Sequence, residues 1–270
     1  MPRGDKAGFP TYWTTFGQGP REALMIHCSL AHSGSWGGLA RHLSGALTMT
    51  AFDMPGHGRS AAWDDRGEIQ GVTVNIAAAF CDGPRDVIGH SFGATVALRL
   101  ARERPDLVRS LVLIEPVFFA VAMRDQPAIW AAHEHKFAEF AAAWKAGDKH
   151  GAARAFTMMW GTGPAWEDLP ETVQDDLAKQ MDLIVAAGGA LHDDPTGMLE
   201  QGGLDPVDMP VLLLEGSDSP PVIGAIQAGL ARRLAQGERV VIAGAQHMVP
   251  ITHADQVARE VLRFLSRVPG

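Results

Sequence analysis

The sequence predicts an α/β protein with a mostly parallel, doubly wound sheet and an inserted all-helical cap. Short apolar runs alternate with helical patterns over residues 1–119 and again over residues 197–270. Such alternation is typical of right-handed strand–helix–strand units in a parallel sheet. Residues 120–196 show helical spacing alone. A third observation is a strand at 86–88 that runs into a Gly-x-Ser-x-Gly turn and then a helix.

The strands of the first segment are short apolar or β-branched runs bounded by charge or by turn residues. A plausible edge strand precedes four buried ones, and we place these five at residues 11–16, 23–26, 48–52, 86–88 and 111–114. The continuous apolar character of the buried runs is typical of a sheet that is covered on both faces.

The helices of the predicted core follow from apolar residues at three- and four-residue spacing. The clearest is the helix after Ser91, where Ala94, Ala97, Leu98 and Ala101 form one stripe and Pro105 ends the pattern. Because its stripe consists of small residues, this helix is expected to lie close to the sheet.

The second segment repeats the alternation and completes the core. We expect strands at 211–214 and 239–242, with a helix between them at 221–234 and a last helix near the end of the chain. The predicted domains are therefore a core of residues 1–119 and 197–270 and a helical cap of residues 120–196.

Composition excludes several classes of partner. The net charge is −8, with 46% hydrophobic and 20% charged residues over 270 positions. An acidic chain is a poor match for nucleic acid or for an anionic membrane, since both attract basic surfaces. The sequence has no 18-residue apolar run, and its first residues lack the apolar segment of a signal peptide. We expect a cytoplasmic protein that acts on a small molecule, and its oligomeric state stays open.

Neither metal nor cofactor is expected. Cys28 and Cys81 are predicted to be free thiols, because nothing indicates an oxidising compartment. Of the histidines, His133, His135 and His192 invite a metal interpretation, but none has partners at ligand spacing.

The Gly-x-Ser-x-Gly turn nominates a nucleophile. Gly89 and Gly93 permit a sharp reversal from strand to helix, which leaves the hydroxyl of Ser91 exposed at the edge of the sheet. The amide of Phe92, the next residue, would form half of an oxyanion hole.

A serine needs a base and a group that orients the base. His247 is the candidate base, because it follows the strand at 239–242 and parallel strands deliver such loops to one edge. Two carboxylates compete as the acid. Asp218 follows the strand at 211–214 and is preferred by chain order, whereas Glu115 follows the strand after the nucleophile and reaches the same edge.

Three motifs together resemble the α/β-hydrolase superfamily over nearly the whole chain: Gly-His-Ser-Phe-Gly at 89–93, Asp-Met-Pro-Gly-His-Gly-Arg-Ser at 53–60 and Gly-Ala-Gln-His at 244–247. The resemblance implies a serine hydrolase whose second oxyanion amide comes from Ser29, with Leu30 as the alternative.

The chain departs from this family at two places. Cys28 stands where the oxyanion loop usually has a glycine. The family commonly places the acid three residues after the glycine that ends the strand, but here Ser219 occupies that position and Asp218 precedes it. Glu115 therefore stays an alternative acid.

Bulky apolar residues of the cap and of nearby loops are candidates for the lining of a substrate pocket, since a cap over a nucleophile must present some apolar surface to it. These candidates are Trp36, Phe118, Phe119, Trp130, Phe137, Trp144, Met158, Met159 and Trp160.

The expected function is hydrolysis of small apolar carboxylic esters or lactones through an acyl-enzyme on Ser91. The same fold and triad resemble those of carbon–carbon bond hydrolases of ring-cleavage products and of cofactor-free perhydrolases, which remain alternatives within enzymes. A non-catalytic small-molecule binding module is the alternative outside enzymes, although such a module has no need of His247.

Overall fold

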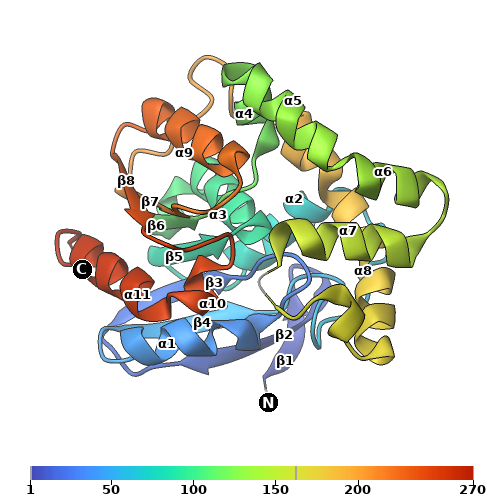
Figure 1. The fold of residues 1–270 in the computed structure, drawn as a ribbon. Helices are drawn as coiled ribbons and strands as arrows, with labels where there is room; N and C mark the ends of the chain where they lie inside the picture. The colour runs from blue at the N-terminus through green and yellow to red at the C-terminus, as the bar shows by residue number, and fades with distance from the viewer. Residues whose placement is uncertain (1, 162, 270) are drawn as a thin grey trace.

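The computed structural model describes residues 2–161 and 163–269, which fold around one eight-stranded sheet (Figure 1). The strand order is β1-β2-β4-β3-β5-β6-β7-β8. Their bounds are Arg3–Lys6 (β1), Phe9–Phe16 (β2), Arg21–Ile26 (β3), Leu47–Phe52 (β4), Arg85–His90 (β5), Val108–Ile114 (β6), Val211–Gly216 (β7) and Gly237–Ile242 (β8).

The strands from β4 to β8 run parallel, and β1 and β2 form an antiparallel edge. Ile26 pairs with Gly89, and His90 pairs with Ile114, so β3, β5 and β6 end side by side. Any loop that leaves these carboxyl ends therefore begins at the same edge of the sheet. The predicted fold class is confirmed.

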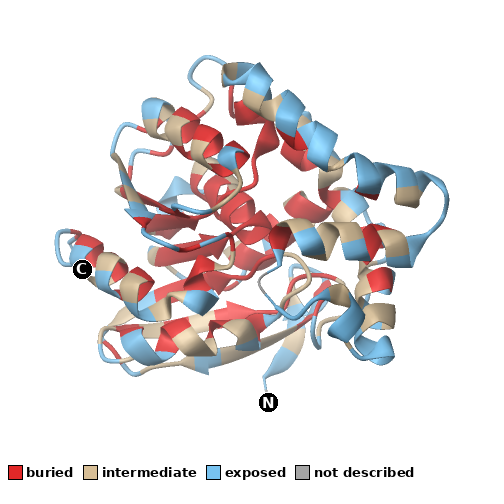
Figure 2. Cartoon of the chain, viewed as in Figure 1, coloured by how far each residue is buried: buried red, intermediate tan, exposed pale blue. Residues whose placement is uncertain are grey.

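The central strands are buried along most of their length (Figure 2). Their side chains alternate between two apolar clusters, one on each face of the sheet. On β7, for example, Leu213 belongs to one apolar cluster, and Leu212 and Leu214 belong to the other. Burial on both faces explains why these strands read as continuous apolar runs rather than as alternating ones.

Helices cover both faces of the sheet. One face carries α1 (Gly37–Leu43), α10 (Val249–Thr252) and α11 (Ala254–Leu265), with α1 packed against α11. The opposite face carries α2 (Ile69–Ala78), α3 (Phe92–Glu103), α4 (Phe119–Asp125) and α9 (Pro221–Arg233). Short 3₁₀ turns lie at Ser33–Trp36, Pro105–Leu107 and Trp166–Asp168.

The helices between β6 and β7 extend to one side of the sheet (Figure 1). They are α5 (Pro127–Lys136), α6 (Ala138–Lys145), α7 (Lys149–Trp160) and α8 (Glu171–His192). Helices α6, α7 and α8 share a small apolar cluster around Phe140 and Met181, whereas Ile129 and Trp130 of α5 pack against the main core. The preceding helix α4 packs against α9 and contributes Val121 to the main core. The division of the chain into a core domain and a cap remains a prediction.

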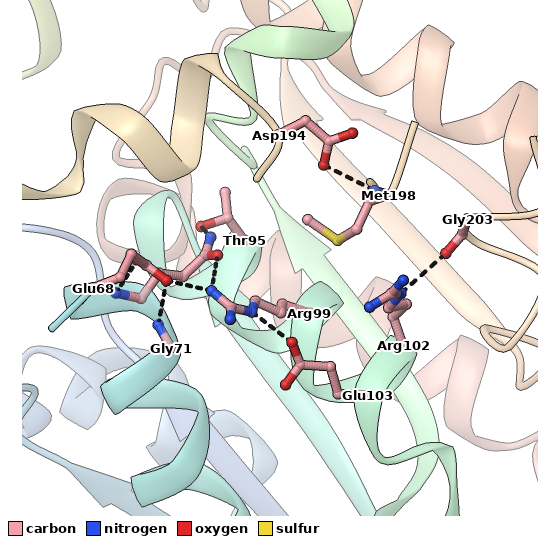
Figure 3. Close-up of polar contacts among 10 residues, drawn as sticks. Glu68, Gly71, Thr95, Arg99, Arg102, Glu103, Asp194, Met198 and Gly203 are labelled. Atoms are coloured by element: carbon pink, nitrogen blue, oxygen red, sulfur yellow. Dashed lines mark hydrogen bonds and ion pairs between the residues drawn. The ribbon is translucent and has the colours of Figure 1, made fainter. Parts of the chain in front are cut away.

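Polar contacts fix helix α3, which starts at the nucleophile turn, to its neighbours (Figure 3). Arg99 pairs with Glu103 and with Glu68, which caps the start of α2. The buried amide of Gln70 donates to Thr95 Oγ1 at 2.9 Å. These contacts hold α3 against α2.

The segment after α8 is closed on itself by Asp194 and joined to α3 by Arg102 (Figure 3). The carboxylate of Asp194 accepts bonds from the amides of Met198 and Leu199, each at 2.8 Å. Arg102 of α3 donates to the carbonyl of Gly203 at 3.3 Å. The chain thus returns from the cap to β7 along a fixed path.

Among the helices in residues 2–161 and 163–269, none combines the length and the apolar character required to cross a membrane.

Candidate active site

Ser91 lies on a sharp turn between β5 and α3. Its backbone has φ 55° and ψ −119°, a strained conformation for a residue with a Cβ. A Cβ on Gly93 would come within 2.2 Å of the carbonyl oxygen of Ile26, and one on Gly89 within 2.4 Å of the carbonyl oxygen of Gly93. Gly93 is therefore required for the close approach of α3 to β3, and Gly89 for the close approach of α3 to β5.

A continuous hydrogen-bond chain joins Ser91, His247 and Glu115. His247 Nε2 lies 3.0 Å from Ser91 Oγ, and His247 Nδ1 lies 3.0 Å from Glu115 Oε2. The carboxylate fixes the tautomer, because Nδ1–H donates to Glu115 and leaves Nε2 free to accept the serine proton. All three side chains are buried. This geometry suits a serine activated by a general base.

Glu115 is held in place by further donors. It follows β6 with φ 51°, and its Oε1 accepts from the amide of Gly216 at 2.6 Å and from Ser219 Oγ at 2.7 Å. The position three residues after Gly216 is thus occupied by a serine, Ser219, which donates to Glu115 from the loop after β7.

The preference for Asp218 over Glu115 is corrected by this geometry. Asp218 is exposed, and its carboxylate accepts from the hydroxyl of Ser217 at 2.8 Å. The chain-order argument for Asp218 failed because β6 lies beside β5 in the sheet. A glutamate at the end of β6 is therefore long enough to reach the histidine.

His90 ties the base to the nucleophile turn. Its Nε2 donates to the carbonyl oxygen of His247 at 2.9 Å, and the two rings lie 5.3 Å apart. Burial, and then the nearby His247, lowers the pKa of His90 to about 3, so its ring is neutral at physiological pH. His90, the last residue of β5, therefore links the turn at Ser91 to the loop that carries His247.

The turn after β3 supplies backbone amides at the same edge. The amide of Ala31 donates to the carbonyl of Cys28, and Leu30 has φ 62°. Among the described residues, no acceptor receives a bond from the amides of Ser29, Leu30 or Phe92. Ser29 and Leu30 line the same cavity as Ser91.

His27 fixes this turn to the 53–60 loop. Its Nδ1 donates to the carbonyl of Cys28 at 2.7 Å, and its Nε2 accepts from the amide of Met54 at 3.0 Å. Cys28 is a free buried thiol, and burial raises its pKa to about 12. Cys81, also free, has a pKa raised to about 11, mainly by burial.

A cavity of about 520 Å³ opens over Ser91 and His247. Of the residues that the sequence nominated as lining, four do line it: Phe119, Trp130, Phe137 and Trp160. The ring centroid of Trp160 lies 4.7 Å from that of His247, so the indole packs against one side of the imidazole.

The other nominated residues lie elsewhere, which corrects their assignment. Phe118 is fully buried in the main core, and Trp36 packs under the sheet with its ring 6.5 Å from that of His90. Trp144 packs within the cap, while Met158 and Met159 line a second hollow on the other side of Trp160. Helical spacing showed that these residues are apolar, but not which neighbour each one faces.

Sequence reasoning missed two polar residues of the cavity wall, His133 and His192. Both were considered only as metal ligands. Within the described part of the chain, no cluster of three or more His, Cys, Asp or Glu side chains is arranged to hold a metal ion. The available signal was the helical spacing of His133 with the apolar residues Ile129, Phe137 and Phe140. A histidine at such a spacing faces the same way as its apolar neighbours.

Comparison with known proteins decides the family. The model of the "Alpha/beta hydrolase family" matches residues 23–260. The chain belongs to this family. The predicted family membership and the assignment as a hydrolase are thereby confirmed.

Two relatives illustrate the similarity. The chain is 29% identical over 259 residues to a pimeloyl-[acyl-carrier protein] methyl ester esterase of Methylococcus capsulatus, covering 93% of this α/β hydrolase and 97% of the relative. It is 43% identical over 101 residues to the lipase LipV of Mycobacterium tuberculosis, where the match covers 36% of this chain and only 38% of the relative.

Solved structures share the fold over the full length of this hydrolase. The enol-lactonase from Burkholderia xenovorans superposes with a TM-score of 0.69 at 19% identity, covering 98% of this chain and all of the other. At this identity, the similarity concerns the fold alone.

Proposed function

We propose that this hydrolase cleaves small apolar carboxylic esters or lactones through an acyl-enzyme on Ser91. The observation that carries the proposal is the hydrogen-bonded chain from Glu115 through His247 to Ser91, placed at the floor of an apolar cavity. The relatives named as an esterase and as a lipase support ester hydrolysis in general.

In the first half of the reaction, Ser91 Oγ attacks the carbonyl carbon of the ester while His247 Nε2 takes its proton. The carbonyl oxygen becomes an oxyanion, and the free amides of Phe92 and Ser29, with Leu30 as the alternative, are the donors proposed to stabilise it. His247 then returns the proton to the leaving alkoxide as the carbon–oxygen bond breaks.

In the second half, His247 takes a proton from water, which attacks the acyl carbon of the Ser91 ester. The tetrahedral intermediate collapses, the proton returns to Ser91 Oγ, and the carboxylic acid leaves. Glu115 stabilises the imidazolium that forms twice in each cycle.

The nature of the cavity supports an apolar acyl group. Phe119, Trp130, Phe137 and Trp160 supply aromatic surface, and further wall residues are Phe140, Phe156, Leu177 and Ile184. A wall of this kind favours apolar groups of substrate by burying their surface.

The proposal is tested by steady-state hydrolysis of a panel of short-chain esters and lactones with wild type and Ser91→Ala. Wild type is expected to turn over several of these substrates, and Ser91→Ala is expected to lose at least about 10³-fold in kcat because the nucleophile is gone. A Ser91→Ala protein of equal melting temperature and undiminished kcat would contradict the proposal.

A further inference from the structure

Two histidines lie in the largely apolar wall of the cavity, which also includes Glu134 and Thr157, and the catalytic chain uses neither histidine. His133 lies on α5 and His192 is the last residue of α8. Each ring contacts the same two aromatic rings: the centroids lie 5.2 and 5.1 Å from that of Phe119, and 5.5 and 5.4 Å from that of Trp130. The two helices thus bring both imidazoles to one part of the wall.

His133 is a buried polar ring without a protein partner. Its exposed fraction is 7%, and its remaining ring neighbours are Phe137 and Trp160. Neither ring nitrogen forms a hydrogen bond with another residue in the described ranges 2–161 and 163–269. Its ring nitrogens are not among the fully enclosed unpaired side-chain atoms, so they remain open to a hydrogen bond from a ligand in the cavity.

The ring of His133 is neutral at physiological pH. Burial, and then the nearby His192 and Lys136, lower its pKa to about 4. A neutral imidazole offers one N–H donor and one acceptor nitrogen. His133, which lines the cavity, therefore offers one donor and one acceptor and no positive charge.

The tautomer of His192 is fixed by its own helix. Its Nδ1 donates to the carbonyl oxygen of Gly188 at 2.8 Å. In the neutral ring, Nε2 then carries no proton and is an acceptor only. His192 lines the cavity, so this part of the wall combines an acceptor from His192 with a donor and an acceptor from His133.

This set of groups discriminates between ligand classes. A carboxylate or phosphate has no hydrogen to donate, and it would meet an acceptor at His192 without a neutralising cation. A carbonyl can use only the donor of His133. A hydroxyl donates one bond and accepts another, and so matches the set.

We propose that His133 and His192 form a hydroxyl-binding subsite, and that the preferred substrates carry an alcohol or phenol hydroxyl on the acyl group, remote from the scissile carbonyl. This inference rests on the proposed ester hydrolysis and names its substrate class. His133 lies close to the catalytic base His247, because Trp160 neighbours both. The ring centroid of Trp160 is 4.7 Å from that of His247 and 5.6 Å from that of His133. One aromatic ring thus separates the base from the subsite, a span that a short chain or a phenyl ring can bridge.

The first test compares pairs of methyl esters that differ only in the hydroxyl. One pair is methyl phenylpropanoate and its para-hydroxylated counterpart; the other is methyl hexanoate and its terminally hydroxylated counterpart. Wild type is expected to prefer the hydroxylated member of at least one pair by about tenfold in kcat/KM, because an unhydroxylated acyl group leaves the buried ring unsatisfied.

The matched variants are His133→Phe and His192→Phe, which keep an aromatic ring of similar size. Each is expected to reduce the preference to about twofold or less, read as the ratio of kcat/KM within one pair, so that any general loss of activity cancels. His150→Phe on α7 is the control, since His150 is exposed, pairs with Asp175 and does not line the cavity. It should keep the wild-type preference. Two variants are used so that a fold defect in one, seen as a lowered melting temperature, leaves the other informative.

A second measurement separates this inference from the proposed function. In Ser91→Ala, calorimetric titration with para-cresol and with toluene reports the subsite without catalysis. Tighter binding of para-cresol, lost in the double variant with His133→Phe, supports the subsite even if no ester is cleaved, in which case the proposed function alone fails. Equal cleavage of both members of each pair by wild type, together with equal binding of para-cresol and toluene, overturns the subsite and leaves ester hydrolysis standing.

Discussion

At the scale of single residues, the carboxylate that orients His247 is the point on which sequence and structure differ. Glu115 Oε2 lies 3.0 Å from His247 Nδ1, and its other oxygen accepts from Gly216 and Ser219. The sequence placed Ser91, His247 and both carboxylates at one edge, but it could not choose between the acids. The choice depends on side-chain reach and on which strand lies beside β5, and neither quantity is local in the sequence.

Glu115→Gln is expected to lower kcat by about 10²- to 10⁴-fold. Because Gly216 and Ser219 both donate to Oε1, the amide oxygen of glutamine is expected to take that place and turn its NH₂ group toward His247. Nδ1 must then accept, so Nε2 carries the proton and cannot receive one from Ser91.

Asp218→Asn is the matched control, because it makes the same chemical change at the carboxylate that chain order favoured. Its kcat is expected to stay within about twofold of wild type, since Asp218 is exposed and bonded to Ser217. Steady-state kinetics on one ester checks both variants. A large loss in Asp218→Asn with little loss in Glu115→Gln would reverse the assignment.

At the scale of elements, the nucleophile turn was predictable, and the pocket was not. The glycines at 89 and 93 identify the turn because their requirement is local: each must avoid a Cβ clash with nearby backbone. The lining depends on how helices α5 to α8 pack over the sheet. Phe118 and Phe119 are neighbours in sequence, yet the first lies in the core and the second lines the cavity.

Gly93→Ala is expected to destabilise the fold by about 2–4 kcal/mol and to abolish hydrolysis. The new Cβ would lie 2.2 and 2.4 Å from the carbonyl oxygens of Ile26 and His27, so α3 would have to move away from β3. Urea unfolding monitored by circular dichroism measures the loss.

Gly45→Ala is the control for this variant, since a Cβ at Gly45 would meet no atom within 4 Å. Its stability should change by less than about 1 kcal/mol. If Gly93→Ala were as stable and as active as Gly45→Ala, the close packing of α3 on β3 would not be what positions Ser91.

At the scale of the whole molecule, the active-site edge is built on buried neutral histidines. Burial is the main cause that lowers the pKa of His27 and His90 to about 3 and that of His57 to about 4. The ring centroids of His27 and of His57, which belongs to the 53–60 loop, lie 5.2 Å apart, and His90 donates to the carbonyl oxygen of His247. The same residues that fix the loops therefore make the fold sensitive to acid.

Stability is predicted to fall as the pH drops from about 6.5 toward about 4. In this window the unfolded chain binds a proton at each of these histidines, whose unperturbed pKa is about 6.5, whereas the folded chain does not until the pH reaches their lowered values. The loss is on the order of 1 kcal/mol per histidine per pH unit, or on the order of 3 kcal/mol between about pH 6.5 and 5.5. Urea unfolding across this range checks it, and a stability that stayed constant or rose would contradict the assignment of neutral buried rings.

The measurement that tests the central claim most directly is covalent labelling of the protein by a fluorophosphonate, followed by intact-mass and peptide mass spectrometry. The account predicts one adduct, on the peptide that contains Ser91, because His247 and Glu115 make this hydroxyl nucleophilic. Labelling should disappear in Ser91→Ala and slow strongly in Glu115→Gln. An unlabelled wild-type protein, or an adduct on another residue that persists in Ser91→Ala, would contradict it.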